Sequence, residues 1–98
     1  MRAAKVDANQ AEIVRALRYW GCTVEVTSMV GGGFPDLVVG LRGVNHLIEI
    51  KDGNKPPSAR LLTTEQERWH RQWLGKVIVV ENVMAALRAV GVIRGDER

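Results

Sequence analysis

Two apolar segments joined by a short turn place the strongest constraint on the fold of this chain. Residues 36–41 and 44–51 are rich in Val, Leu and Ile, and only Arg42 and Gly43 stand between them. Segments of this kind predict β-strands, and so short a connection predicts an antiparallel hairpin. Because the middle of each segment is almost continuously apolar, both faces of the resulting sheet are expected to be covered.

Charged residues occupy the ends of these segments. Asp36 opens the first, and Glu49 and Lys51 close the second. If Arg42 and Gly43 form the turn, Asp36 lies opposite Glu49 on the same face of the hairpin. Lys51 shares that face because strand side chains alternate. If the register is shifted by two residues, Asp36 pairs with Lys51 and the cluster remains. A shift by an odd number of residues breaks the cluster.

Two carboxylates so close together repel each other and favour a cation between them. Hard oxygen ligands without a neighbouring Cys or His favour Mg²⁺ or Mn²⁺ over zinc. A lysine beside such an ion could stabilise the transition state of phosphodiester hydrolysis or help to activate water. In the alternative interpretation, Asp36 caps a turn, and Glu49 and Lys51 form a surface ion pair.

The residues before the hairpin predict a helix and a strand. The helix is expected to be capped by Asp7 or Asn9 and to run to about Trp20. Residues 23–27 alternate and are β-branched, so they predict a short strand. Three glycines and a proline make residues 30–35 a loop that could let a nucleic-acid backbone approach Asp36.

The residues after the hairpin predict three further elements. A polar loop at 52–60 leads to a helix capped by Thr63 or Thr64. An apolar run at 76–80 predicts a fourth strand, and Asn82 is suited to cap a last helix. The order is therefore αβββαβα, which is an α/β fold.

Composition adds weaker constraints. The 98 residues suit a single domain, 1–98, and the net charge of +3 is compatible with a nucleic-acid partner without requiring one. Cys22 is the only cysteine, and His46 and His70 are isolated in sequence, so neither a disulfide nor a zinc site is expected. No signal peptide and no membrane span are recognisable, so a cytoplasmic protein is expected.

Pro35-Asp36 followed by Glu49-Ile50-Lys51 resembles the signature of the PD-(D/E)XK nucleases. A wider pattern resembles the VRR-NUC family of phage and repair nucleases. It consists of residues 32–40, which include Pro35-Asp36, then Ile-Glu-Ile-Lys at 48–51 and Leu-Thr-Thr-Glu-Gln at 62–66. The resemblance implies a restriction-endonuclease-like αβββαβ core, in which helices flank a mixed four-stranded sheet, with an extra C-terminal helix.

The resemblance also implies a role for each motif residue. Asp36, Glu49 and the main-chain carbonyl of Ile50 would hold the metal, and Lys51 would be the catalytic lysine. Gln66 would support them from the helix that follows. The implied cofactor is Mg²⁺, with Mn²⁺ expected to support activity as well.

Two of the implied roles have alternatives. Gln66 could instead complete a capping box with Thr63, an equally good explanation of its position. The family places an acidic residue on the first helix, for which Glu12 is the candidate and Gln10 its rival. Glu12 could also be a solvated charge paired with Arg15.

The implied activity is that of a hydrolase, a Mg²⁺-dependent DNA endonuclease acting on branched DNA such as a Holliday junction or a flap. Lys55 and Arg60 would contact phosphates. The likeness to Holliday-junction resolvases implies a homodimer, and the phage-type sequence implies action in the host-cell cytoplasm. The alternatives are a nicking nuclease without structural preference and a non-catalytic nucleic-acid-binding module.

Overall fold

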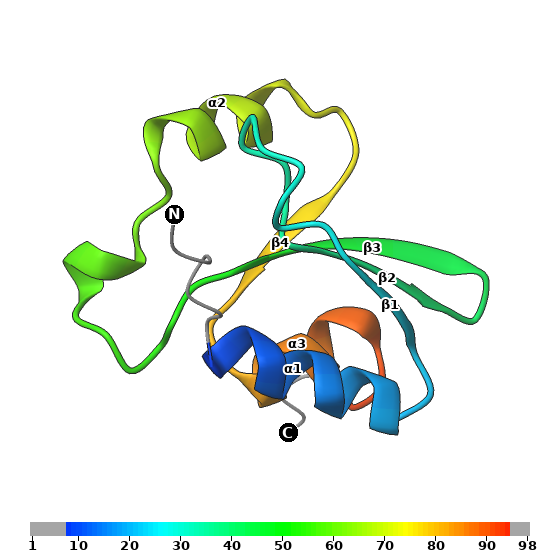
Figure 1. The fold of residues 1–98 in the computed structure, drawn as a ribbon. Helices are drawn as coiled ribbons and strands as arrows, with labels where there is room; N and C mark the ends of the chain where they lie inside the picture. Colours follow the sequence, from blue (N-terminus) through cyan, green and yellow to red (C-terminus); the bar gives the residue numbers. More distant parts are fainter. Residues whose placement is uncertain (1–7, 95–98) are drawn as a thin grey trace.

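The computed structural model describes residues 8–94 and contains the expected order of elements (Figure 1). In chain order these are α1 (Ala8–Tyr19), β1 (Thr23–Val26), β2 (Leu37–Leu41), β3 (Val44–Ile50), η1 (Pro57–Arg60), α2 (Thr64–Gln72), β4 (Val77–Val80) and α3 (Val83–Val90). The short 3₁₀ helix η1, in the loop after β3, was not predicted. Asp7, one of the two expected caps of the first helix, lies outside the described residues.

The four strands form one mixed sheet in the order β1-β2-β3-β4. The β1–β2 and β2–β3 pairs are antiparallel, and β4 runs parallel to β3. Leu41 lies opposite Val44 and Leu37 opposite Ile48, so the predicted hairpin register is confirmed. The turn residues Arg42 and Gly43 both have positive φ angles, 52° and 80°, which match the right-handed twist of a two-residue hairpin.

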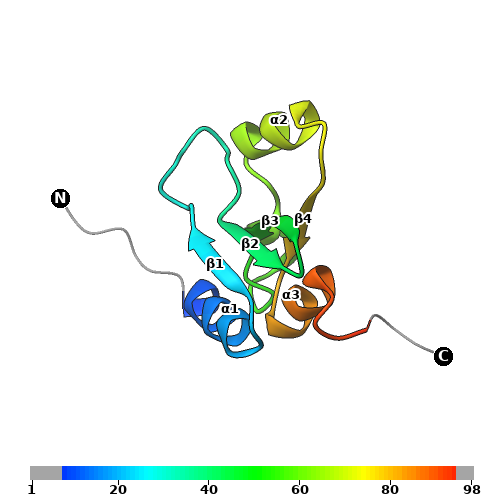
Figure 2. The same cartoon turned by 90° about the vertical axis from the view of Figure 1, so that its right-hand side faces the viewer.

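The hydrophobic core lies on one face of the sheet. Helices α1 and α3 lie side by side beneath this face, as the two ribbon views agree (Figures 1 and 2). The strand residues that alternate toward the helices are buried, as are the apolar positions of both helices. The core residues are Ile13, Val14, Leu17, Cys22, Val24, Leu37, Val39, Ile48, Ile50, Val80, Ala86, Leu87 and Val90.

The opposite face is covered less completely, so the expectation of two covered faces is wrong for this side. Val38 and Leu47 are only half-buried there, and Val79 is 42% exposed. Helix α2 stands at one end of the sheet rather than across it, and it has no buried residue (Figure 2). An apolar strand composition therefore did not distinguish a fully packed sheet from one with a half-open face.

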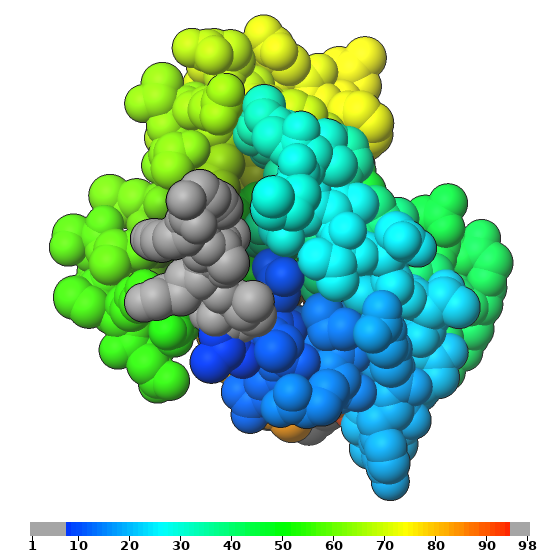
Figure 3. Space-filling model, in the orientation of Figure 1, coloured from blue at the N-terminus to red at the C-terminus, as the bar shows by residue number. Residues whose placement is uncertain are grey.

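The loop between β1 and β2 packs against α2 (Figure 3). Gly33 makes the closest approach, because a Cβ built there would lie 2.5 Å from the main-chain oxygen of Glu65. Next to it, the rings of Phe34 and Trp69 meet edge to face with centroids 5.3 Å apart. This contact holds the start of α2 beside Asp36, the residue that follows the loop.

Candidate active site

Asp36 lies immediately before β2, where its carboxylate continues the pairing of the hairpin. Its Oδ2 accepts a hydrogen bond of 2.8 Å from the main-chain N–H of Ile50. The side chain thus occupies the place of a main-chain acceptor, which explains why the strand begins at Leu37 rather than at Asp36. Asp36 is thereby fixed against the end of β3.

Glu49 is the one buried charged residue among the described part of the chain, with 1% of its surface exposed. Its Oε2 accepts a hydrogen bond of 3.0 Å from Nε2 of Gln66, and Nζ of Lys51 lies 3.9 Å from the same oxygen. Its Oε1 is buried and has no hydrogen-bond partner among the described residues. A buried carboxylate oxygen without a partner is costly and indicates that a ligand belongs there.

Gln66 and Lys51 complete the group. Nζ of Lys51 donates a hydrogen bond of 2.8 Å to Oε1 of Gln66. The same Oε1 accepts from the N–H of Thr63, and the hydroxyl of Thr63 accepts from the N–H of Gln66, so the capping box is also formed. The two interpretations of Gln66 therefore do not exclude each other. We call Asp36, Glu49, Lys51 and Gln66 the polar cluster.

The electrostatics of the polar cluster favour a protonated Glu49 in the absence of a cation. Burial is the largest cause and acts together with the negative charge of Asp36 to raise the pKa of Glu49 from its ordinary value of 4.5 to about 8. The ammonium group of Lys51 acts in the opposite direction. The site therefore carries a proton at the position where a metal ion would neutralise the same two carboxylates.

The donor set fits a hard divalent ion. Among residues 8–94 no group of three acidic, histidine or cysteine side chains lies close enough to hold a metal. An ion here would rely on the two carboxylates, main-chain oxygen and water, which is how Mg²⁺ is usually bound. The N–H of Ile50 faces Asp36, and in a strand the C=O of a residue lies on the same side as its N–H. The carbonyl of Ile50 therefore belongs to the Asp36 side of β3.

Comparison with known proteins bears on the fold and the family of this chain. A solved structure described as a VRR_NUC domain matches with a TM-score of 0.60 and 29% sequence identity, covering 83% of this chain and 88% of that structure. No family model and no curated protein matches the chain. This match supports membership of the VRR-NUC family. It confirms the expected fold and points to a nuclease of the PD-(D/E)XK type, which is a hydrolase.

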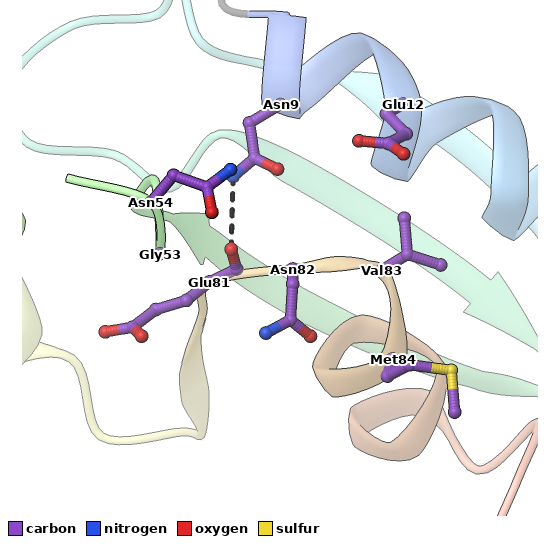
Figure 4. Close-up of a pocket in the computed structure, with 8 residues that line it drawn as sticks. All are labelled: Asn9, Glu12, Gly53, Asn54, Glu81, Asn82, Val83 and Met84. Carbon is purple, nitrogen blue, oxygen red and sulfur yellow. Dashed lines mark hydrogen bonds between the residues drawn. The ribbon is translucent and has the colours of Figure 1, made fainter.

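Glu12 is not one of the residues of the polar cluster. It is exposed on α1 and lines a separate hollow of about 310 Å³ with residues such as Asn82 and Met84 (Figure 4). Its rival Gln10 is half-buried. No group of three potential metal-binding side chains is found among the described residues, and the role of Glu12 as the first-helix acid stays a prediction.

The two expected phosphate contacts, Lys55 and Arg60, differ in their surroundings. Lys55 is exposed in the loop after β3. Arg60, at the end of η1, forms an ion pair of 3.1 Å with Glu81, and its Nε is buried without a hydrogen-bond partner in the described structure. A phosphate would have to compete with Glu81 for Arg60, so Lys55 is the better placed of the two.

Sequence reasoning missed two polar residues near the polar cluster. His70 follows Gln66 by one helical turn, and its Nε2 is buried without a hydrogen-bond partner among the described residues. Burial lowers the pKa of His70, and the charge of Lys51 lowers it further. Its spacing from Gln66 was the available signal. The second is Asn9, whose contacts to β3 and β4 no local pattern announces.

Among the described residues, no helix has both the length and the apolar character needed to cross a bilayer.

Proposed function

We propose that the chain is a Mg²⁺-dependent endonuclease that hydrolyses phosphodiester bonds in DNA. The observation that carries the proposal is the buried Oε1 of Glu49, which has no hydrogen-bond partner among the described residues. The other oxygen of this carboxyl group, Oε2, accepts a hydrogen bond from Gln66 and lies 3.9 Å from Nζ of Lys51. A binding module would need basic residues and would gain nothing from two neighbouring acids that repel each other. This is why a catalytic role is preferred to a non-catalytic one.

Each residue of the polar cluster has a role in the proposal. Asp36, Glu49 and the carbonyl of Ile50 would hold Mg²⁺, which supplies charge neutralisation and an acidified water molecule when bound. Mn²⁺ would serve in its place. Lys51 would stabilise negative charge that develops on the phosphate. Gln66 would orient both Lys51 and Glu49, since it contacts each of them.

The proposed substrate is branched DNA, and the proposed enzyme is a homodimer. Support for a dimer comes from exposed apolar residues along β4, an edge strand of the described sheet, and before it: Trp73 is 44%, Leu74 99% and Val79 42% exposed. Pairing this surface in two copies would bury it, and a dimer would present two sites to the paired strands of a branch. Action in the cytoplasm, that of a host cell if a phage encodes the enzyme, belongs to the same proposal.

The decisive experiment compares cleavage by the wild type and by Lys51→Ala. Labelled Holliday junctions, flaps and linear duplexes are incubated with Mg²⁺, Mn²⁺ or EDTA. Lys76→Ala, which changes an exposed lysine just before β4, is the matched control. We expect metal-dependent cleavage by the wild type and by the control and none by Lys51→Ala. Equal cleavage by the wild type and Lys51→Ala would reject the site, and equal cleavage of all substrates would replace structure selectivity with unselective nicking.

The dimer has its own test. In analytical ultracentrifugation, the wild type is expected to sediment as a dimer and Leu74→Glu as a monomer, because the substitution places a charge in the proposed interface. Tyr19→Glu alters a comparably exposed residue at the end of α1, the helix under the opposite face of the sheet, and should leave the dimer intact. A monomeric wild type at micromolar concentration would exclude this part of the proposal.

A further inference from the structure

Asn9 joins three parts of the fold through one side chain. It lies in the first turn of α1, so it is not the residue that caps this helix. Its Nδ2 donates a hydrogen bond of 3.1 Å to the main-chain oxygen of Lys51 and one of 3.3 Å to that of Glu81. Figure 4 shows the second of these bonds. The two acceptors are 42 and 72 residues away in sequence.

Both acceptors lie where a strand has just ended. Lys51 follows β3 and Glu81 follows β4, and these strands are parallel neighbours. Two main-chain hydrogen bonds continue the pairing beyond that point, from the N–H of Lys51 to the oxygen of Val80 and from the N–H of Gly53 to the oxygen of Glu81. Asn9 therefore bridges the two carboxyl ends of the strands from outside the sheet, in the region where chains usually begin to diverge.

Lys51 is held at three points as a result. Its N–H donates to the oxygen of Val80 at 2.9 Å, its C=O accepts from Asn9, and its Nζ donates to Gln66. The three partners come from β4, α1 and α2. Of these contacts, only the bond from Asn9 fixes the carbonyl side of Lys51, from which the chain departs into the loop.

We propose that Asn9 is a positioning residue, whose amide clips the ends of β3 and β4 together and so sets the orientation of Lys51 in the polar cluster. The inference rests on the proposed function, because it assigns Asn9 to the same site. An amide suits this task because its NH₂ group has two hydrogens for two carbonyl oxygens. Small displacements of a catalytic group lower the rate steeply, so a side chain that holds Lys51 in place can affect the reaction without touching the substrate.

The choice between Asn and Asp at this position gives a sharp test. An acidic residue in the first turn of a helix is favoured by the helix dipole, so Asp would be an improvement if residue 9 served α1 alone. If residue 9 instead bridges the carbonyl oxygens of Lys51 and Glu81, an Asp side chain has no hydrogen to donate, and its own oxygens face these two carbonyl oxygens. The two roles thus predict opposite orders for Asn9→Asp and Asn9→Ala.

The experiment uses the full chain with Asn9→Asp, Asn9→Ala and the control Ala8→Asp, which adds the same charge at an exposed neighbouring position. DNA cleavage is measured in Mg²⁺ well below the melting temperature, and amide exchange of Lys51 and Gly53 is measured without metal. We expect kcat to fall by about 10- to 100-fold in Asn9→Ala and at least as far in Asn9→Asp. KM should stay within about twofold, because the Asn9 amide donates to main-chain oxygens of the protein itself.

Several outcomes would overturn the inference. A kcat of Asn9→Asp equal to that of the wild type would do so. A kcat of Asn9→Asp above that of Asn9→Ala would also do so, because this order is expected if residue 9 serves α1 alone. A lower melting temperature with unchanged kcat would reduce Asn9 to a structural residue. If the wild type does not cleave DNA, the proposed function fails, but amide exchange at Lys51 and Gly53 still tests the clip. Exchange as slow in Asn9→Ala as in the wild type would reject it.

Discussion

Gln66 on α2 donates a hydrogen bond of 3.0 Å to the buried carboxyl group of Glu49 on β3. Helix α2 has no buried residue of its own, so this polar contact is a principal link between the helix and the sheet. The opposite end of the same amide group accepts from Lys51. One side chain therefore connects the position of α2 with the geometry of both charged residues on β3.

Replacement of Gln66 by Ala should impair both activity and stability. Loss of its contacts with Glu49 and Lys51 is expected to lower kcat by about 10- to 100-fold. Loss of its share of the capping box should lower the free energy of unfolding by about 1 kcal/mol. Single-turnover cleavage and urea unfolding measure the two effects separately.

Thr63→Ala is the matched control for Gln66→Ala. It removes the hydroxyl that accepts from the N–H of Gln66, at a cost of about 1 kcal/mol, without removing the amide that contacts Glu49. Cleavage by Thr63→Ala should therefore stay close to that of the wild type. If both variants lose activity to the same extent, Gln66 acts only through the start of α2.

The raised pKa of Glu49 makes the metal-free protein less stable in alkaline solution. The folded state keeps a proton on Glu49 up to about pH 8, whereas the unfolded chain releases it near the ordinary value of 4.5. Because the folded state binds more protons between these values, stability falls as the pH rises through this window. The melting temperature in EDTA should decline between pH 5 and pH 8.

Glu49→Gln separates this effect from other titrations. The amide keeps an acceptor for Gln66 but cannot ionise, so the variant should melt at least about 4 °C above the wild type at pH 8.5 in EDTA. It should also lose metal-dependent cleavage. Parallel melting curves for the two proteins across the pH range would show that burial does not raise the pKa of Glu49 as described.

The hairpin explains why so much of the site could be predicted from sequence. A short turn fixes the register, and the register alone brings Asp36 against the end of β3, where its carboxylate meets the N–H of Ile50. Gln66 was accessible because a capping box and a helical face are both local patterns. These predictions depended on spacing along the chain and not on tertiary packing.

The remaining features depend on contacts between distant segments. Nothing near Asn9 in sequence indicates that its amide reaches the ends of β3 and β4. In the same way, Arg60 was expected at DNA because it is basic and in a loop, but the fold brings Glu81 to it. Coverage of the second sheet face depended on where α2 settles, which the apolar pattern of the strands does not specify.

The contact between the β1–β2 loop and α2 predicts an unequal tolerance of its glycines. Gly33→Ala is expected to cost about 3 kcal/mol, since its Cβ would lie 2.5 Å from the main chain of Glu65 at a φ of +87°. Gly31→Ala has a similar φ of +84° but open space around the new Cβ, so it should cost only about 1 kcal/mol. Urea unfolding compares the two, and equal losses would show that the loop does not pack on α2.

The surroundings of Lys55 and Arg60 predict different effects on DNA binding. With cleavage blocked by Lys51→Ala, affinity is measured by fluorescence anisotropy over a range of salt concentrations. Lys55→Ala should lower the slope of log K against log salt by about one, because one phosphate contact is lost. Arg60→Ala should leave the slope unchanged, since Glu81 already neutralises the guanidinium group, and the half-exposed ion pair contributes only about 0.5 kcal/mol to stability.

Glu81→Gln completes this comparison. The substitution removes the charge that holds Arg60, so the guanidinium group becomes available and the salt slope should increase by up to about one. Arg60→Ala introduced into Glu81→Gln should then abolish the increase. A slope that already falls in Arg60→Ala alone would instead mean that Arg60 leaves Glu81 when DNA binds. The ion pair would then hold the loop after β3 in the free protein, and DNA binding would break it.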